Sequence, residues 1–139
     1  MKLQAVILIE PVPKARARYT VRGGKVRAYT PANTREAELI IMMEIRRILS
    51  RQGRFQDKQP VRLVGTFFLK RPQSLPKKIT MPVSRPDWDN FGKLLSDSLN
   101  FFVYRDDSQV TTAIIKKRYG FPPRIEITLE EDSQLDERA

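Results

Sequence analysis

The stretch DWDNFGKLLSDSLNFF, residues 87–102, decides how the chain folds because its apolar residues recur in steps of three and four. These apolar residues are Trp88, Phe91, Leu94, Leu95, Leu99 and Phe102. Such spacing places them on one face of a helix from Trp88 to about Phe101. The opposite face carries Asp89, Lys93, Asp97 and Asn100. The stretch therefore predicts an amphipathic helix that packs on a core and presents charged groups to solvent.

Strand-like runs rich in β-branched and aliphatic residues flank this helix on both sides. They are LQAVILIE at 3–10, VRLVGTFFLK at 61–70, QVTTAIIKKRYG at 109–120 and RIEITLEE at 124–131. We expect the last two runs, which only FPP separates, to be neighbours in one sheet.

A second helix is predicted to begin after Asn33 and to run to about Arg51. Asn33 and Glu36 have the form of a capping box, and Gly53 supplies a C-terminal stop. Its predicted apolar face consists of Ala37, Ile40, Ile41, Ile45, Ile48 and Leu49, and its predicted solvent face of Glu38, Arg46, Arg47 and Arg51. Together these elements predict an α+β fold with two layers, in which two main helices pack on a small mixed β-sheet.

The size and charge of the chain suggest one domain with a polyanionic partner. The sequence has 139 residues, which suits a single domain over residues 1–139. It contains 26 Lys and Arg against 16 Asp and Glu, a formal net charge of +10. An excess of this size favours binding to a polyanion.

Cysteine and histidine are both absent, so thiolate nucleophiles, imidazole bases and Cys/His zinc sites are excluded. Any chemistry must use carboxylates, lysine or a metal ion. The N-terminal MKLQAVILIEP offers only about five consecutive apolar residues, fewer than a signal peptide or a membrane span needs. We therefore expect a cytoplasmic protein that does not contact a membrane.

Two basic segments and one acidic tail complete the chain. Residues 14–30 surround Gly23-Gly24 and predict a basic hairpin, and the proline-rich residues 71–86 predict a long basic loop. Residues 131–139 are acidic and are expected to fray. The residues expected to contact DNA phosphates are Lys14, Arg16, Arg18, Arg22, Lys25, Arg27, Lys77, Lys78 and Arg85.

Two pairs of aspartates stand out in this basic chain. Asp87 and Asp89 lie at the start of the helix that begins at Trp88, and Asp106 and Asp107 precede a strand. A purely structural interpretation makes the first pair helix caps, and makes Lys93 a solvated ion-pair partner of a nearby aspartate. Several carboxylates held together would repel one another unless a divalent cation lay between them. Oxygen ligands favour Mg²⁺, Mn²⁺ or Ca²⁺, so the pattern also fits a metal site for phosphodiester hydrolysis.

The segment PDWDNFGKLLSDSLN, followed by VYRDDSQV, closely resembles the signature of the RusA family of Holliday junction resolvases. That signature reads approximately Pro-Asp-x-Asp-Asn-x-x-Lys-x-x-x-Asp-Ala-Leu-Asn-Gly, then Asp-Asp-x-Gln-Val/Ile after a short gap. The resemblance implies a RusA-like fold and a homodimeric, Mg²⁺-dependent endodeoxyribonuclease, often encoded by phages or prophages. Such an enzyme nicks four-way DNA junctions symmetrically during recombination and repair, and Mn²⁺ is a possible substitute for Mg²⁺.

The resemblance assigns roles to residues. It implies metal-binding, catalytic carboxylates at Asp87, Asp89 and Asp107 and an essential lysine at Lys93. It also implies supporting roles for Asn90 and Asp106. A helix of about 13 residues carries the chain ~20 Å from Asp89, so Asp107 reaches the site on a returning strand of the same subunit or from the partner. We expect the same subunit.

Departures from the signature and other functions remain open. Phe101 replaces the usual Gly, and Trp88 replaces a commonly aliphatic residue and is expected in the core. Phe101 and Phe102 favour a core or dimer contact over a wedge between DNA bases. The alternative functions are a non-catalytic nucleic-acid-binding protein and a nuclease for flaps or forks.

Overall fold

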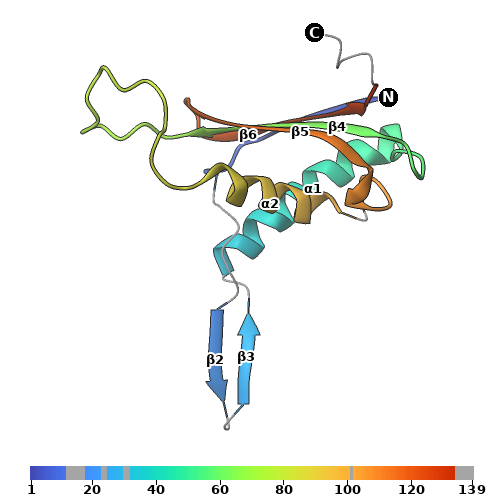
Figure 1. Ribbon diagram of the computed structural model, residues 1–139, viewed down its shortest axis with the longest axis horizontal. Coiled ribbons are helices and arrows are strands. Elements are labelled where there is room, and N and C mark those ends of the chain that lie inside the picture. Colours follow the sequence, from blue (N-terminus) through green and yellow to red (C-terminus); the bar gives the residue numbers. More distant parts are fainter. Residues whose placement is uncertain (12–17, 23–24, 30–31, 101, 134–139) are drawn as a thin grey trace.

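Two helices lie on one face of a four-stranded mixed β-sheet in the computed structural model (Figure 1). The structure describes residues 1–11, 18–22, 25–29, 32–100 and 102–133. The sheet has the order β1-β6-β4-β5, and the helices are α1 (Ala32–Gln52) and α2 (Trp88–Leu99). Its strands are β1 (Lys2–Ile7), β4 (Val61–Leu69), β5 (Val110–Tyr119) and β6 (Arg124–Glu131). The α+β prediction is confirmed.

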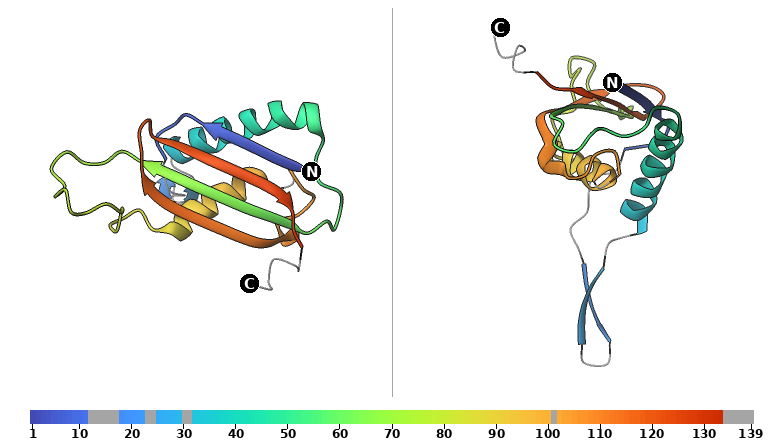
Figure 2. Two further views of the ribbon diagram at one scale, coloured as in Figure 1. Left: turned by 90° about the horizontal axis from the view of Figure 1, so that it is seen from above. Right: turned by 90° about the vertical axis from the view of Figure 1, so that its right-hand side faces the viewer.

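β4 lies at the centre of the sheet, parallel to β5 and antiparallel to β6 (Figure 2). The prediction that β5 and β6 are neighbours is therefore wrong. Helix α2 connects β4 to β5 as a crossover, so β5 runs parallel to β4 at one edge. The segment 120–123 then steps over the end of β4, where the Gly120 N–H donates to the Leu69 carbonyl at 3.1 Å. Because β5 occupies one edge of β4, β6 pairs with the other edge.

The core lies between the sheet and the two helices. In β4 the side chains of Val61, Leu63 and Phe67 alternate toward the helices, as the two-residue period of a strand requires. Phe67 stacks on Phe91 of α2 with ring centroids 4.6 Å apart. A Cβ at Gly65 would lie 2.7 Å from Leu95 Cδ2. Helix α2 thus packs directly against the central strand.

Helix α1 differs from its prediction at the N-terminus and on one side. It begins at Ala32, so Asn33 lies inside its first turn and not before it. It ends before Gly53, whose φ of +77° confirms the predicted stop. Ile41 and Ile45 are buried as expected, whereas Ile40 is 42% exposed. The apolar stripe is therefore wider than the core that it covers.

The predicted basic hairpin is present as β2 (Arg18–Arg22) and β3 (Lys25–Tyr29). These strands pair antiparallel with Arg22 opposite Lys25, and they stand away from the two layers (Figure 2). Lys14 and Arg16 lie outside the described residues. The hairpin thus presents its basic sequence at a distance from the core.

The loop and tail predictions fare differently. Residues 71–86 form neither helix nor strand, as predicted, and extend beyond the end of β4 (Figure 1). The expected fraying from residue 131 is wrong at its start, because Glu131 belongs to β6. Asp132 accepts hydrogen bonds from the Thr111 and Thr112 hydroxyls at 2.6 and 2.7 Å. Residues 134–139 lie outside the described part.

No helix of the described segments has the length and apolar character needed to cross a membrane.

Candidate active site

A pocket of about 430 Å³ follows the polar stripe of α2. Apolar side chains of β4 and β5 line one side of it, which is consistent with the packing of α2 on these strands. Its polar lining residues are Asp89, Lys93, Ser96, Asp97, Tyr104 and Asp107. The structure therefore brings Asp89, Lys93 and Asp107 of one chain to one pocket. Asp87, Asn90 and Asp106 do not line the pocket, although each is adjacent in the sequence to a residue that does.

Asp87 occupies the N-cap position of α2, with an extended backbone at φ −75° and ψ 151°. Its side chain makes no cap hydrogen bond, so the carboxylate does not perform the structural role that a capping aspartate would have. Asp89, in the first turn of the helix, accepts a hydrogen bond at Oδ1 from the Asn90 backbone N–H at 3.1 Å. Both carboxylates are exposed and can receive further ligands.

The chain before Asp87 is fixed to the sheet by a lysine that sequence reasoning missed. Lys117 of β5 donates from Nζ to the carbonyls of Ser84 at 2.9 Å and Pro86 at 2.7 Å. Lys117 lies on the same face of β5 as Ile115, which lines the pocket. A lysine on the helix-facing side of a strand needs partners, and that requirement was the available sequence signal.

Asp107 sits on a short 3₁₀ helix, η1 (Asp107–Gln109), that Asp106 caps. Asp106 accepts from the Ser108 N–H at 3.2 Å, and its own N–H donates to Gln109 Oε1 at 3.2 Å. Hydrogen bonds from the Ser108 side chain and backbone hold the pKa of the Asp106 carboxyl below its usual value. Asp106 is thus ionised and has a structural function that holds its neighbour in place.

Two amide side chains of the same signature anchor η1 to the rest of the fold. Gln109 is buried, and its Nε2 donates to the carbonyls of Gln56 at 2.9 Å and Gln59 at 3.1 Å. Asn100 accepts at Oδ1 from the Asp107 N–H at 3.0 Å. These bonds fix the backbone of Asp107 at the C-terminal end of α2.

The acidic residues are consequently spread along the pocket. Asp89 lies in the first turn of α2, and Asp97 lies two turns later, about 12 Å along the helix axis. Asp107 follows beyond Asp97, beside the end of the helix. Among the residues that the structure describes, no three acidic side chains lie close enough together to hold a metal ion.

The donor atoms nevertheless suit a magnesium ion. Mg²⁺ commonly binds one or two carboxylates and completes its shell with waters and substrate phosphate. Asp89 at one end of the pocket and Asp107 at the other offer such oxygen donors, with no competing sulfur or imidazole ligand in the sequence. The pocket therefore fits a hydrated divalent cation better than a fully protein-bound one.

Lys93 lies between these acids and makes no ion pair within the described part of the chain. It is exposed on the pocket side of α2. The structural interpretation, in which Lys93 pairs with Asp89 or Asp97, is not supported. A lysine without an internal partner is available to a phosphate.

The aromatic residues near the site divide between core and surface. Trp88 is 64% exposed and lines the pocket, so the expectation that it is buried in the core is wrong. It lies one turn before Gly92, on the polar stripe and not on the Phe91 side. Phe102 packs against the core, with the Arg46 guanidinium 5.1 Å from its ring centroid. Phe101 lies outside the described residues.

Three pocket residues had no role in the sequence prediction: Ser96, Asp97 and Tyr104. Tyr104 is fully buried, and its hydroxyl has no hydrogen-bond partner in the structure. Burial, followed by the charges of Asp107 and Asp106, raises the pKa of the Tyr104 phenol far above its usual value. The phenol is therefore a neutral hydrogen-bond donor. Its position three residues before Asp107 was the available sequence signal.

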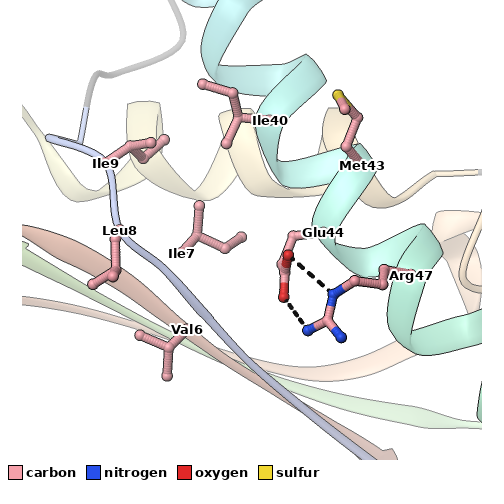
Figure 3. Close-up of a pocket in the computed structure, with 8 residues that line it drawn as sticks. All are labelled: Val6, Ile7, Leu8, Ile9, Ile40, Met43, Glu44 and Arg47. Carbon is pink, nitrogen blue, oxygen red and sulfur yellow. Dashed lines mark hydrogen bonds and ion pairs between the residues drawn. The ribbon is translucent and has the colours of Figure 1, made fainter.

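A second hollow, of about 480 Å³, lies between β1 and α1, away from these acids (Figure 3). Exposed apolar side chains line it, with Val6 and Leu8 on the β1 side and Met43 on α1. Its charged groups, Glu44 and Arg47, pair with each other at 2.6 Å. This hollow offers apolar surface and not catalytic groups.

Comparison with known proteins identifies the family of the chain. Residues 9–130 match the family described as Endodeoxyribonuclease RusA. The chain is also 29% identical over 136 residues to a Bacillus subtilis (strain 168) protein named "Uncharacterized protein YqaN". That alignment covers 89% of this chain and 92% of the relative. Since the family match spans most of the chain, the protein belongs to the RusA endodeoxyribonuclease family.

Proposed function

We propose that the protein is a divalent-metal-dependent endonuclease that resolves four-way DNA junctions by symmetric paired nicks, in recombination and repair. The observation that carries this proposal is the pocket that Asp89, Lys93 and Asp107 line within a chain of net charge +10. A protein that only bound DNA would lose Coulomb energy by placing carboxylates toward phosphates. Family membership supports the nuclease class, and DNA as substrate suggests the cytoplasm as the place of action.

The proposed roles follow the family signature. Asp87 and Asp89 at the start of α2, and Asp107 beside its end, would each offer carboxylate oxygens to hydrated Mg²⁺, or Mn²⁺ in its place. When bound, the metal supplies a water of lowered pKa and offsets phosphate charge. Lys93 places a cation beside the scissile phosphate and stabilises the charge that develops on it. Lys117 holds the chain entering α2, and Gln109 holds η1, so both acidic segments keep their positions.

The DNA-binding surface is proposed to consist of the hairpin β2–β3 and the loop 71–86. Lys77, Lys78 and Arg85 are exposed on that loop, which leads directly to Asp87. The hairpin stands clear of the two layers and can reach a strand of DNA away from the pocket (Figure 1). Contacts to phosphates on both sides of the cut would set the register of the DNA.

A homodimer is part of the proposal because two matched cuts need two matched sites, which a two-fold axis supplies. The hollow between β1 and α1 is the surface we propose for it (Figure 3). β1 is an edge strand, and Leu8 and Met43 are each 71% exposed there. Edge strands and apolar surface of this kind commonly mark protein interfaces.

Light scattering tests the dimer. We expect twice the chain mass for wild type and a single chain mass for Met43→Glu. The matched control is Val83→Glu, since Val83 is 83% exposed on the proline-rich loop and outside the hollow. A wild type that is monomeric at working concentration contradicts the dimer.

Cleavage of a labelled synthetic four-way junction beside linear duplex tests the function, with Mg²⁺ or EDTA. Wild type should make paired nicks in the junction only, and EDTA, Asp89→Asn or Asp107→Asn should abolish them. Asp57→Asn is the control, because Asp57 pairs with Arg105 on the surface outside the pocket. Tight binding without a cut under any metal would favour the non-catalytic alternative. Faster cutting of flaps or forks would change the substrate assignment.

A further inference from the structure

Tyr104 is the one polar side chain of the described structure whose buried atom has no hydrogen-bond partner. The residue is fully buried and lines the same pocket as Asp107. An unpaired buried hydroxyl lowers stability, because the group has lost its water and gained nothing in return. A phenylalanine would fill the same space without that cost. Packing therefore explains the ring of Tyr104 but not its hydroxyl.

An unpaired acceptor lies close to this unpaired donor. Within the described residues, no hydrogen bond or ion pair reaches the exposed carboxylate of Asp107. Tyr104 and Asp107 line the same pocket and are three residues apart in the sequence. The backbone of Asp107 is fixed by Asn100, so only its short side chain is left to rotate.

We propose that Tyr104 is a positioning residue whose hydroxyl donates a hydrogen bond to the Asp107 carboxylate and fixes how that carboxylate faces the pocket. The inference rests on the proposed function, in which Asp107 is a metal ligand. A group that orients a ligand typically changes metal affinity by about 10–100-fold when it is removed. Asp107 is preferred to Asp106 as the acceptor, because the Asp106 carboxylate is already oriented by its bond from Ser108 and does not line the pocket.

Calorimetric titration with Mn²⁺, in the absence of DNA, tests this directly in the full-length protein. We expect Tyr104→Phe to bind Mn²⁺ about 10–100-fold more weakly than wild type. Tyr119→Phe is the matched control, because it removes the same hydroxyl from β5 outside this pocket. Equal Mn²⁺ affinity of wild type and Tyr104→Phe would overturn the inference.

Junction cleavage as a function of Mg²⁺ concentration gives a second readout. Tyr104→Phe should need correspondingly more Mg²⁺ and reach nearly the wild-type rate at saturation. A slow rate at every Mg²⁺ concentration, with unchanged affinity, would mean that the hydroxyl acts on DNA and not through Asp107. In an Asp107→Asn background, Tyr104→Phe should cause no further loss of Mn²⁺ affinity by calorimetry. An additional, additive loss would overturn the pairing.

Thermal unfolding without metal checks the premise. Tyr104→Phe should lose no more stability than the one hydrogen bond to Asp107 provides, and it should lose none in an Asp107→Asn background. A loss of stability of the same size in the Asp107→Asn background would show that the hydroxyl has a different partner, and would overturn the inference. If wild type itself neither bound Mn²⁺ nor cut junctions, the proposed function would fail. If wild type did both and Tyr104→Phe matched it, only this inference would fail.

Discussion

Lys117 donates a hydrogen bond from Nζ to the backbone carbonyl of Pro86 at 2.7 Å, which joins β5 to the residue before Asp87. We predict that Lys117→Met slows junction cleavage by about 10–100-fold, because small displacements of a catalytic group are costly. Junction affinity should change little. Lys116→Met is the control, since Lys116 is exposed on the opposite face of β5 and removes the same charge. Equal effects of the two variants on cleavage would assign the loss to net charge.

Gln109→Ala should lower the free energy of unfolding by about 1–3 kcal/mol, because the carbonyls of Gln56 and Gln59 lose their donor. Cleavage should also fall, since η1 no longer holds Asp107. Urea denaturation measures the first effect, and junction cleavage the second. Gln4→Ala, on the exposed side of β1, is a control of the same residue type. An unchanged midpoint for Gln109→Ala would contradict the anchoring role.

Lys93→Ala should bind junctions with nearly wild-type affinity and cut them about 10²–10³-fold more slowly, as expected for the loss of a group that stabilises developing charge. Single-turnover cleavage with enzyme in excess, beside a binding titration without metal, separates the two effects. Lys93→Arg keeps the charge with a different shape and should recover only part of the rate. Equal losses in binding and cleavage would make Lys93 a binding residue.

The stability of the protein should depend on Tyr104 above about pH 10. Burial raises the folded pKa of this phenol above its unfolded value. The unfolding free energy of wild type relative to Tyr104→Phe is constant below the unfolded pKa of the phenol. It falls as the pH rises from there toward the folded pKa, because the phenol ionises first in the unfolded chain. The difference in unfolding free energy between wild type and Tyr104→Phe should fall by at most about 1.4 kcal/mol per pH unit there. Urea denaturation from pH 8 to 11 measures this, and a constant difference would refute it.

Junction binding should weaken steeply with salt, with a log–log slope that reports the number of phosphate contacts. Replacing Arg22 and Lys25, which pair across the hairpin, with Gln should reduce the slope by about 2. The control replaces Lys2 and Arg51, which are exposed on the body of the domain, with Gln. Equal changes in slope for both double variants would mean that net charge, and not the hairpin, determines binding.

The elements that the sequence predicted well are those defined by local periodicity. The strand-like run at 61–70, the helical spacing of α2 and the stop at Gly53 each depend on neighbouring residues, and all three agree with the structure. The order of the strands depends on contacts that no local pattern contains. The insertion of β4 between β5 and β6 was therefore missed.

The same distinction applies to the candidate site. The signature located Asp89, Lys93 and Asp107, and the structure brings them to one pocket, whereas their binding of a metal stays a prediction. The residues that hold them were missed because their partners are distant in sequence. Gln109 reaches a carbonyl 53 residues away, and Lys117 one 31 residues away. Trp88 is three residues before the buried Phe91 and four residues before Gly92, which lines the pocket, so helical periodicity could not decide which side of α2 it occupies.

Helix α2 carries Asp89 and Lys93 on one side, and on the other buries Phe91, Leu94 and Leu95. Its backbone amides should therefore exchange with deuterium only when the whole domain unfolds, whereas exposed elements exchange through local opening. The side chains proposed for cleavage are thus carried by a helix that we expect to resist local unfolding. If the proposed junction substrate is correct, we expect the deformation on binding to fall on the DNA and on the hairpin β2–β3, which stands away from the two layers, and not on α2.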